Sequence, residues 1–148
     1  MHTISESNIE EAICLFLESQ GVSIEKVSSE GFWNEKRWIY QKRRSKYSKS
    51  WTSDLHGTIA PLWRGLYIEV KKKSEMKFFD RPTHELEKSL IVATYDKWLS
   101  KSSIKRYAHA VEQARYIEDK LKHWAVAFYA SSIDEVKWKL KNFWIEVT

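Results

Sequence analysis

The stretch that decides the fold is residues 53–71, SDLHGTIAPLWRGLYIEVK. It contains two short apolar runs, at residues 55–60 and 66–70, and Pro61 and Gly65 lie between them. Two apolar runs separated by turn-forming residues are typical of a β-hairpin. The sequence therefore predicts two antiparallel strands here, and the rest of the chain is interpreted around them.

Three charged residues lie at one end of this predicted hairpin. Asp54 precedes the first run, and Glu69 and Lys71 end the second. Because side chains alternate along a strand, Glu69 and Lys71 lie on the same face, and pairing of the strands can bring Asp54 beside them. Two carboxylates at one point suit Mg²⁺, and a nearby lysine can stabilise negative charge. Acid and lysine pairs are also common on ordinary surface strands, so the solvated alternative stays open.

An amphipathic helix is predicted before the hairpin. Apolar residues recur over residues 9–17 at the spacing of one helical face. Two capping boxes compete for its start, Thr3 with Glu6 and Ser7 with Glu10. We prefer the first, because it places Glu6 in the first turn near the buried face.

The remaining elements follow from periodicity and caps. Their order is one helix, a β meander, two helices, one strand and one helix, which predicts an α/β fold with a mixed central sheet flanked by helices. Residues 73–105 then form a helical insertion. The predicted ranges are strands at 22–27 and 33–41, a loop or hairpin tip at 43–53, helices from Pro82 to about 99 and from Ser102 or Ser103 to about 122, a strand at 124–130, and a helix to about 143 capped by Ser132 and Glu135.

Composition limits the class of protein. The 148 residues suit a single domain spanning 1–148, and no internal linker is visible. No apolar run is long enough to span a membrane, and the N-terminus does not resemble a secretory signal. Cys14 is the single cysteine and the five histidines lack metal-ligand spacing, so we expect no zinc site and a reducing, cytoplasmic compartment. We also expect most of the eight tryptophans, about six, to lie in the core.

Positive charge is concentrated in one segment. The formal net charge is +5, and residues 36–51 contain seven cations, no acid and four interleaved aromatic residues. Cations that neutralise phosphates, beside rings that stack on bases, are typical of nucleic-acid binding. The alternatives are a solvated basic loop, an acidic protein partner or a membrane surface. The candidate contacts to nucleic acid are Arg43, Arg44, Lys42, Lys46, Tyr40 and, beyond the segment, Lys72.

The hairpin segment resembles the core of the PD-(D/E)XK nucleases, and more narrowly the VRR-NUC group, the virus-type replication-repair nucleases. The resemblance rests on Ser53-Asp54-Leu55-His56-Gly57 and Tyr67-Ile68-Glu69-Val70-Lys71. The opening helix, with Glu6 near its start, is similar to the family's first helix. Gln113 resembles the family's helix glutamine, and a strand and a capped helix follow it as in the family. The likeness covers most of the chain except residues 73–105.

The resemblance implies a restriction-endonuclease-like core and a role for each matched residue. Asp54, Glu69 and the Val70 main-chain carbonyl would bind Mg²⁺ or Mn²⁺, and Lys71 would be the catalytic lysine. Glu6 would support the metal through water, and Gln113 would orient Lys71 or a phosphate. Glu6 also fits a plain capping acid, with Glu10 as the runner-up for the site, and Gln113 also fits a solvated helix edge. The departures are Ser53 in place of proline and Lys122-His123 in place of a glycine pair.

The implied activity is a metal-dependent DNA nuclease, an endonuclease of phage or bacterial type. It would cut flapped or branched DNA in replication, recombination or repair. DNA is the expected partner, a homodimer is compatible with the small size of the domain, and no membrane partner is expected. The alternative is a nuclease-like module that binds nucleic acid within a larger complex without cutting it. The intact set of Asp54, Glu69 and Lys71 favours the enzyme, because burying converging charges without a metal is costly.

Overall fold

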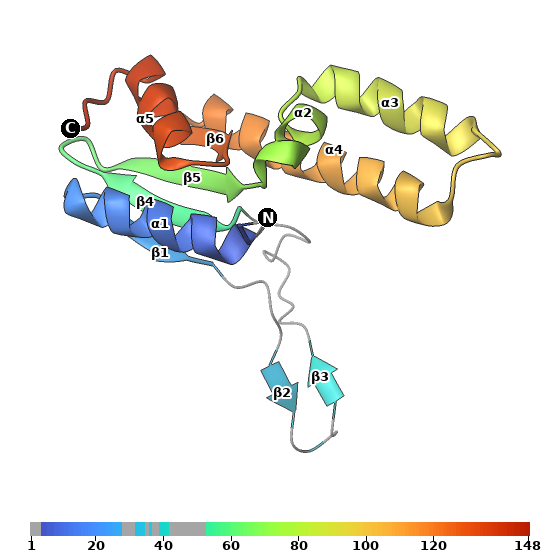
Figure 1. The fold of residues 1–148 in the computed structure, drawn as a ribbon, viewed down its shortest axis with the longest axis horizontal. Coiled ribbons are helices and arrows are strands. Elements are labelled where there is room, and N and C mark those ends of the chain that lie inside the picture. Colours follow the sequence, from blue (N-terminus) through green and yellow to red (C-terminus); the bar gives the residue numbers. More distant parts are fainter. Residues whose placement is uncertain (1–3, 28–31, 35, 37–38, 42–52) are drawn as a thin grey trace.

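The structure, a computed structural model, describes residues 4–27, 32–34, 36, 39–41 and 53–148. Within these ranges it is an α/β fold with a four-stranded mixed sheet flanked by helices (Figure 1). The sheet contains β1 (Ser23–Lys26), β4 (Leu55–Ile59), β5 (Arg64–Val70) and β6 (Val126–Ala130), in that order across the sheet. The α/β class predicted from the sequence is confirmed at this level.

The predicted hairpin of residues 53–71 is confirmed. β4 and β5 pair antiparallel with Leu55 opposite Ile68, whereas β5 and β6 pair parallel with Glu69 opposite Tyr129. β1 pairs antiparallel with the other side of β4. Gly57 is needed at this last pairing, because a Cβ there would collide with the main-chain oxygen of Ser23. β5 is therefore held between two strands, and its last residues are fixed in position.

The two faces of the sheet are covered by different helices (Figure 1). Helices α1 (Glu6–Ser19) and α5 (Ile133–Asn142) cover one face, and α4 (Lys101–Lys122) packs on the other. The alternation of β5 divides its side chains between two cores. Leu66, Ile68 and Val70 pack with α1 and α5, and Tyr67 packs on the α4 side. Glu69 falls on the α4 face by the same alternation.

The helix caps were predicted with mixed success. Both predicted starts of α1 were wrong, because Ser5 is its N-cap and accepts a hydrogen bond from the Asn8 N–H at 3.2 Å. The cap of α5 is confirmed, since the Ser132 side chain accepts from the Glu135 N–H. α4 begins slightly earlier than predicted, with Ser100 as its N-cap.

The segment predicted as a helical insertion contains a short 3₁₀ turn, η1 (Lys73–Glu75), then α2 (Met76–Phe79) and α3 (Thr83–Tyr95). α3 packs along α4, and the two helices project together beyond the sheet (Figure 1). α3 ends four residues before the predicted end, because Asp96 turns out of the helix and its carboxylate accepts from the Trp98 N–H at 2.9 Å. We call the pair α3 and α4, with their connecting turn, the arm.

The single strand predicted at residues 33–41 was wrong. This part contains two short strands, β2 (Phe32–Asn34) and β3 (Ile39–Gln41), which pair antiparallel with each other. Residues 43–52 of the predicted loop or hairpin tip lie outside the described residues. In the part of the chain that the structure describes, no helix has the length and apolar character needed to cross a membrane.

The tryptophan prediction was also wrong. Five of the eight tryptophans are largely exposed, with exposed fractions between 56% and 95%. They lie in turns, at helix ends or on an outer helix face, where none of the described elements covers them. The high aromatic content suggested that tryptophans would fill the core. Aliphatic residues of β5, β6, α1 and α5 fill it instead. The exposed tryptophans are Trp63, Trp98, Trp124, Trp138 and Trp144.

Candidate functional site

The structure brings Asp54 and Glu69 together by two hydrogen bonds that cross between strands. The Val70 main-chain N–H donates to Asp54 Oδ2 at 2.9 Å, and the Asp54 main-chain N–H donates to Glu69 Oε2 at 3.3 Å. Asp54 directly precedes β4, and Glu69 and Val70 are the last two residues of β5. The hairpin pairing therefore produces the juxtaposition that the sequence predicted.

Lys71 completes the cluster from the residue that follows β5. Its Nζ lies 3.2 Å from Glu69 Oε1, and the two side chains are only 9% and 3% exposed. The Lys71 main-chain N–H donates to the Ala130 carbonyl, which fixes the backbone to β6. The ammonium also lies over the Phe79 ring, 4.2 Å from its centroid. Lys71 is thus held beside the carboxylates by contacts on both sides.

Gln113 reaches the same cluster from α4. Its Nε2 donates to Glu69 Oε1 at 2.8 Å and lies 3.0 Å from His109 Nε2. The side chain is buried, with 1% exposed, so the alternative of a solvated helix edge was wrong. Four residues separate His109 from Gln113, which places both on one face of α4. Glu69 Oε1 therefore receives one donor from Gln113 and one from Lys71.

Burial and charge crowding set the protonation of Glu69. Burial, and then the charge of Asp54, raise the pKa of Glu69 to about 9, against the opposing effect of Lys71. Two carboxyl groups in contact cannot both ionise cheaply, so one keeps a proton. At neutral pH and without a bound cation, Glu69 is therefore protonated and donates a hydrogen bond toward Asp54.

Glu6, in the first turn of α1, lies within the electrostatic reach of the cluster. Burial and a hydrogen bond with Glu75 raise the pKa of Glu6, the charge of Asp54 adds to this, and Lys71 opposes it. Glu75, at the end of η1, was not predicted as a site residue. No local pattern marks it, because the contact with Glu6 joins segments far apart in the sequence.

Glu10, the runner-up to Glu6, has a different partner. Its Oε2 lies 2.7 Å from Lys26 Nζ on β1, and the Glu10 residue is buried while the lysine side chain is 57% exposed. This ion pair joins α1 to β1. Glu10 therefore has a structural contact of its own, and Glu6 is the acid of α1 whose charge couples to Asp54 and Lys71.

The donors at the cluster fit a hard divalent cation. Asp54 and Glu69 provide two carboxylates, which Mg²⁺ accepts together with water and substrate oxygens. The Val70 carbonyl points to the same side of β5 as its N–H, since both groups of one strand residue face the same neighbour. That side carries Asp54. Among the described residues no group of three or more His, Cys, Asp or Glu side chains is arranged to hold a metal, so the set is limited to these two carboxylates and the carbonyl.

The predicted contacts to nucleic acid are only partly visible. Tyr40 lies on β3, and its side chain lies outside the described part of the structure. Lys72 follows the cluster directly, at the start of η1, and is half-buried. The other predicted contacts, Lys42, Arg43, Arg44 and Lys46, lie outside the described residues.

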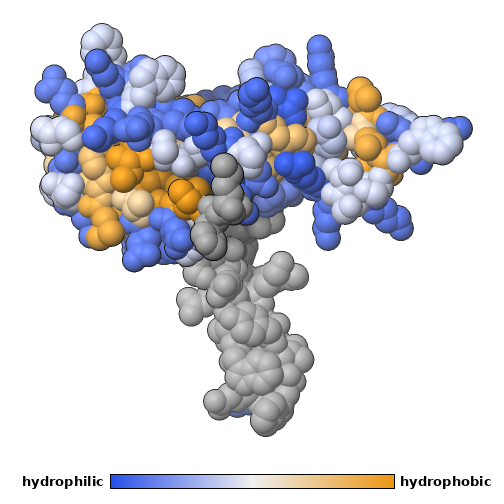
Figure 2. All heavy atoms as spheres, in the orientation of Figure 1, coloured by the Kyte–Doolittle hydropathy of each residue, from blue (hydrophilic) through white to orange (hydrophobic). Residues whose placement is uncertain are grey.

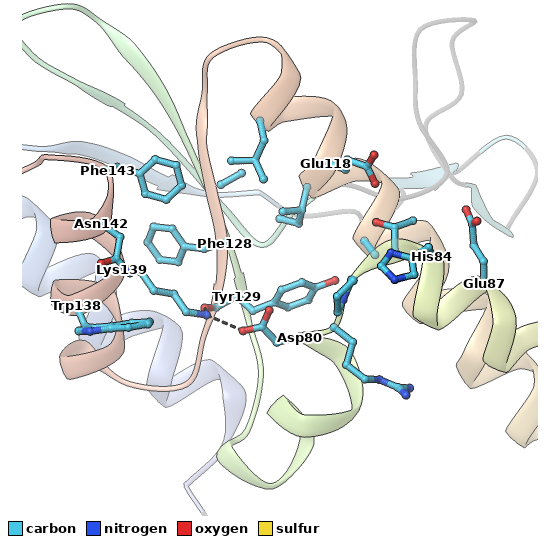
Figure 3. Close-up of a pocket in the computed structure, with 17 residues that line it drawn as sticks. Asp80, His84, Glu87, Glu118, Phe128, Tyr129, Trp138, Lys139, Asn142 and Phe143 are labelled. Carbon is cyan, nitrogen blue, oxygen red and sulfur yellow. Dashed lines mark hydrogen bonds and ion pairs between the residues drawn. The ribbon is translucent and has the colours of Figure 1, made fainter.

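A separate cavity of about 790 Å³ opens along the outer edge of β6, between α5 and the start of α3 (Figure 3). Lys139 lines this cavity and donates to Asp80 at 2.7 Å and to the Tyr129 carbonyl at 2.5 Å. Asp54, Glu69 and Lys71 do not line this cavity. Tyr129 connects the cavity with the cluster, because it lines the cavity and is also the cross-strand neighbour of Glu69.

No protein-family model, curated protein or solved structure matches this chain. The functional argument is therefore carried by the residues of the cluster and by their arrangement.

Proposed function

We propose that this chain is a Mg²⁺- or Mn²⁺-dependent DNA nuclease of the PD-(D/E)XK type, within the VRR-NUC group. The observation that carries the proposal is the contact between Asp54 and Glu69 with the Lys71 ammonium beside them. A buried carboxyl whose pKa is raised by burial and by a second carboxylate is typical of a functional site. Here Glu69 has the raised pKa, and Asp54 and the Lys71 ammonium lie beside it at the open end of the hairpin.

The arrangement of elements supports the family assignment. The acid of the first helix, the hairpin acids, the lysine and the helix glutamine come from four separate elements. Hydrogen bonds or electrostatic coupling connect all five side chains. A strand and a Ser-capped helix follow the glutamine helix, as in the family that the sequence resembles. A random surface pair of Glu and Lys would have no buried glutamine donor.

Each residue has a role that follows from its position. Asp54, Glu69 and the Val70 carbonyl would hold the metal, which supplies an activated water and neutralises charge at the phosphodiester. The Lys71 ammonium stabilises the negative charge that develops on the attacked phosphate. Gln113 orients Glu69 by its hydrogen bond, and Glu6, which is coupled to Asp54 and Lys71, would support the metal through water.

Cleavage assays test the proposal directly. Linear, flapped and four-way-junction DNA are incubated with EDTA, Mg²⁺ or Mn²⁺, using the parent protein, Lys71→Ala and Lys141→Ala. We expect cleavage only with metal, loss of cleavage in Lys71→Ala, and parent-like cleavage in Lys141→Ala, which removes an exposed lysine of α5. The preferred substrate then defines the class of DNA structure.

Two results would contradict the proposal. If Lys71→Ala and Asp54→Ala both cut like the parent, the cluster is not the active site. If the parent binds DNA and never cuts it, and calorimetry detects no Mn²⁺ binding, the chain is a binding module with a nuclease-like arrangement.

A further inference from the structure

A line of polar and basic side chains runs along α4 from the tip of the arm to the candidate site. Each member is four residues from the next, about 6 Å along the axis and about 40° around it, so neighbouring members are adjacent and the row winds obliquely around the helix. The last member, Gln113, donates to Glu69, and the one before it contacts Gln113. We call this line the α4 ridge, and it consists of Lys101, Lys105, His109 and Gln113.

The outer half of the ridge is available to a ligand. Lys101 and Lys105 are exposed, and none of the residues that the structure describes forms an ion pair with either. Lys101 is twelve residues from Gln113, about 18 Å along the helix. Steps of about 6 Å are close to the spacing of consecutive phosphates along one nucleic-acid strand. The two ridge lysines can therefore each lie opposite one of two successive phosphates.

Two aromatic residues stand at the outer end of the ridge. Tyr95 and Trp98 are 85% and 86% exposed, the highest of any aromatic side chains on the arm. Two hydrogen bonds hold the turn that carries them. The Asp96 carboxylate accepts from the Trp98 N–H, and the Ser100 hydroxyl caps α4 by accepting from the Ser103 N–H. In Figure 2 the projecting end of the arm shows weakly polar and apolar surface beside strongly hydrophilic surface. Large rings presented on a fixed turn are suited to stacking.

We propose that the arm binds a single-stranded segment of DNA that leaves the candidate active site. The ridge lysines contact successive phosphates, and Trp98 stacks on an unpaired base beyond Lys101, at the outer end of the ridge. Base stacking on an exposed ring needs an unpaired base, which favours a single strand over a blunt duplex. This inference rests on the proposed nuclease function and names the part of the chain that would hold the single-stranded arm of a flapped or branched substrate.

The charge around the tip agrees with this ligand. Lys97 is also exposed, and its Nζ lies 5.6 Å from the centroid of the Trp98 ring. The acids in the neighbourhood are Asp96, whose carboxylate caps the turn, and Glu112, which lies one position beside the ridge. The tip therefore offers several cations against one acid that already has a hydrogen-bond partner.

Fluorescence anisotropy in EDTA tests the inference without any need for cleavage. The probes are a fluorescein-labelled oligothymidine and a blunt duplex of equal length. For Lys101→Ala/Lys105→Ala we expect the slope of log K against log salt for the oligothymidine to fall by about 1.4, because each phosphate contact in a single strand contributes roughly 0.7. For Trp98→Ala we expect a roughly 10-fold weaker affinity with the slope unchanged, and no change on the duplex.

Matched controls come from the other end of the molecule. Lys137→Ala/Lys141→Ala removes a lysine pair of the same spacing from α5, and Trp144→Ala removes a tryptophan that is 95% exposed. The inference is wrong if these controls weaken binding as much as the arm variants do. It is also wrong if Trp98→Ala weakens the duplex and the single strand equally, or if it changes only the oligomeric state in light scattering.

The two proposals fail in different ways. The nuclease proposal fails alone if the parent never cuts DNA but Lys101→Ala/Lys105→Ala lowers the salt dependence of oligothymidine binding. In that case the arm binds a single strand without cleavage. If the parent cuts DNA in a metal-dependent way and the arm variants bind and cut normally, the inference about the arm fails alone.

Discussion

The Asp54 carboxylate accepts a hydrogen bond from the Val70 main-chain N–H at 2.9 Å, which joins the residue before β4 to the last residue of β5. The bond crosses the open end of the hairpin, beyond the last backbone pair at Leu55 and Ile68. It places the carboxylate of Asp54 beside that of Glu69 before any ligand arrives. The two carboxyl groups are thus kept together by the backbone, and burial together with the charge of Asp54 raises the pKa of Glu69.

Asp54→Asn removes the charge of this residue but keeps an oxygen that can accept the hydrogen bond from Val70. The asparagine oxygen can still accept from the Val70 N–H, so we expect a melting temperature close to that of the parent. Loss of a carboxylate ligand should weaken Mn²⁺ binding at least about 10-fold. Isothermal titration calorimetry measures this, with Asp134→Asn, on an exposed position of α5, as the control. Parent-like Mn²⁺ affinity in Asp54→Asn would remove Asp54 from the metal site.

Stability without metal should depend on pH through Glu69. Its pKa is about 9 in the folded protein, against an ordinary value of 4.5. Between these values the folded state binds more protons than the unfolded state, so the free energy of unfolding falls as pH rises. The stabilising contribution is complete below about 4.5 and is lost as pH rises through about 9.

Urea unfolding in EDTA across this pH range measures the effect. Glu69→Gln should flatten the dependence, because the amide has no proton to lose. Glu25→Gln, at an exposed position of β1, should leave it unchanged. An equal pH dependence in Glu69→Gln and the parent would show that another group is responsible.

Gln113→Leu removes the amide donor to Glu69 while nearly conserving side-chain volume. We expect the free energy of unfolding to fall by about 1–3 kcal/mol, since the buried Glu69 carboxyl loses a hydrogen-bond donor. Turnover should fall at least about 10-fold, because Glu69 loses a bond that orients it. Steady-state cleavage of the preferred DNA checks this, and Glu112→Gln on the exposed side of α4 is the control. Full activity in Gln113→Leu would make the glutamine a packing residue.

Substitution of Glu6 should affect cleavage, whereas substitution of Glu10 should affect stability. Glu10→Gln weakens an ion pair whose lysine is 57% exposed, so we expect a loss of about 1 kcal/mol or less and unchanged cleavage. Glu6→Gln removes an acid coupled to Asp54 and Lys71, so we expect slower cleavage with little change in stability. Parallel melting curves and cleavage rates compare them. The reverse pattern would place Glu10 in the site and Glu6 in the scaffold.

Local chemistry determined the hairpin and its acids. The apolar runs on either side of Pro61 and Gly65 predicted β4 and β5 without information on distant residues. The alternation of side chains along a strand placed Glu69 and Lys71 on one face. The cap formed by Ser132 and Glu135 was predictable for the same reason, because a cap is completed within one turn of helix.

Features that depend on distant contacts were missed. Residues 33–41 have strand propensity throughout, and the pattern could not show that β2 and β3 pair with each other. Tryptophan content predicted burial, yet Trp98 and Trp144 are exposed because none of the elements that the structure describes packs over the turns that carry them.

The sequence by itself determined the central hairpin, the α/β class and the face that carries Glu69 and Lys71. Only the tertiary structure decided that Gln113 is buried against Glu69, that Glu75 contacts Glu6, and that the α4 ridge leads from the site to the aromatic tip. The physical reason is that propensity and alternation act over a few neighbouring residues. Which side chains meet across the sheet depends on how α4 packs on β5 and β6, and that packing minimises the free energy of the whole chain.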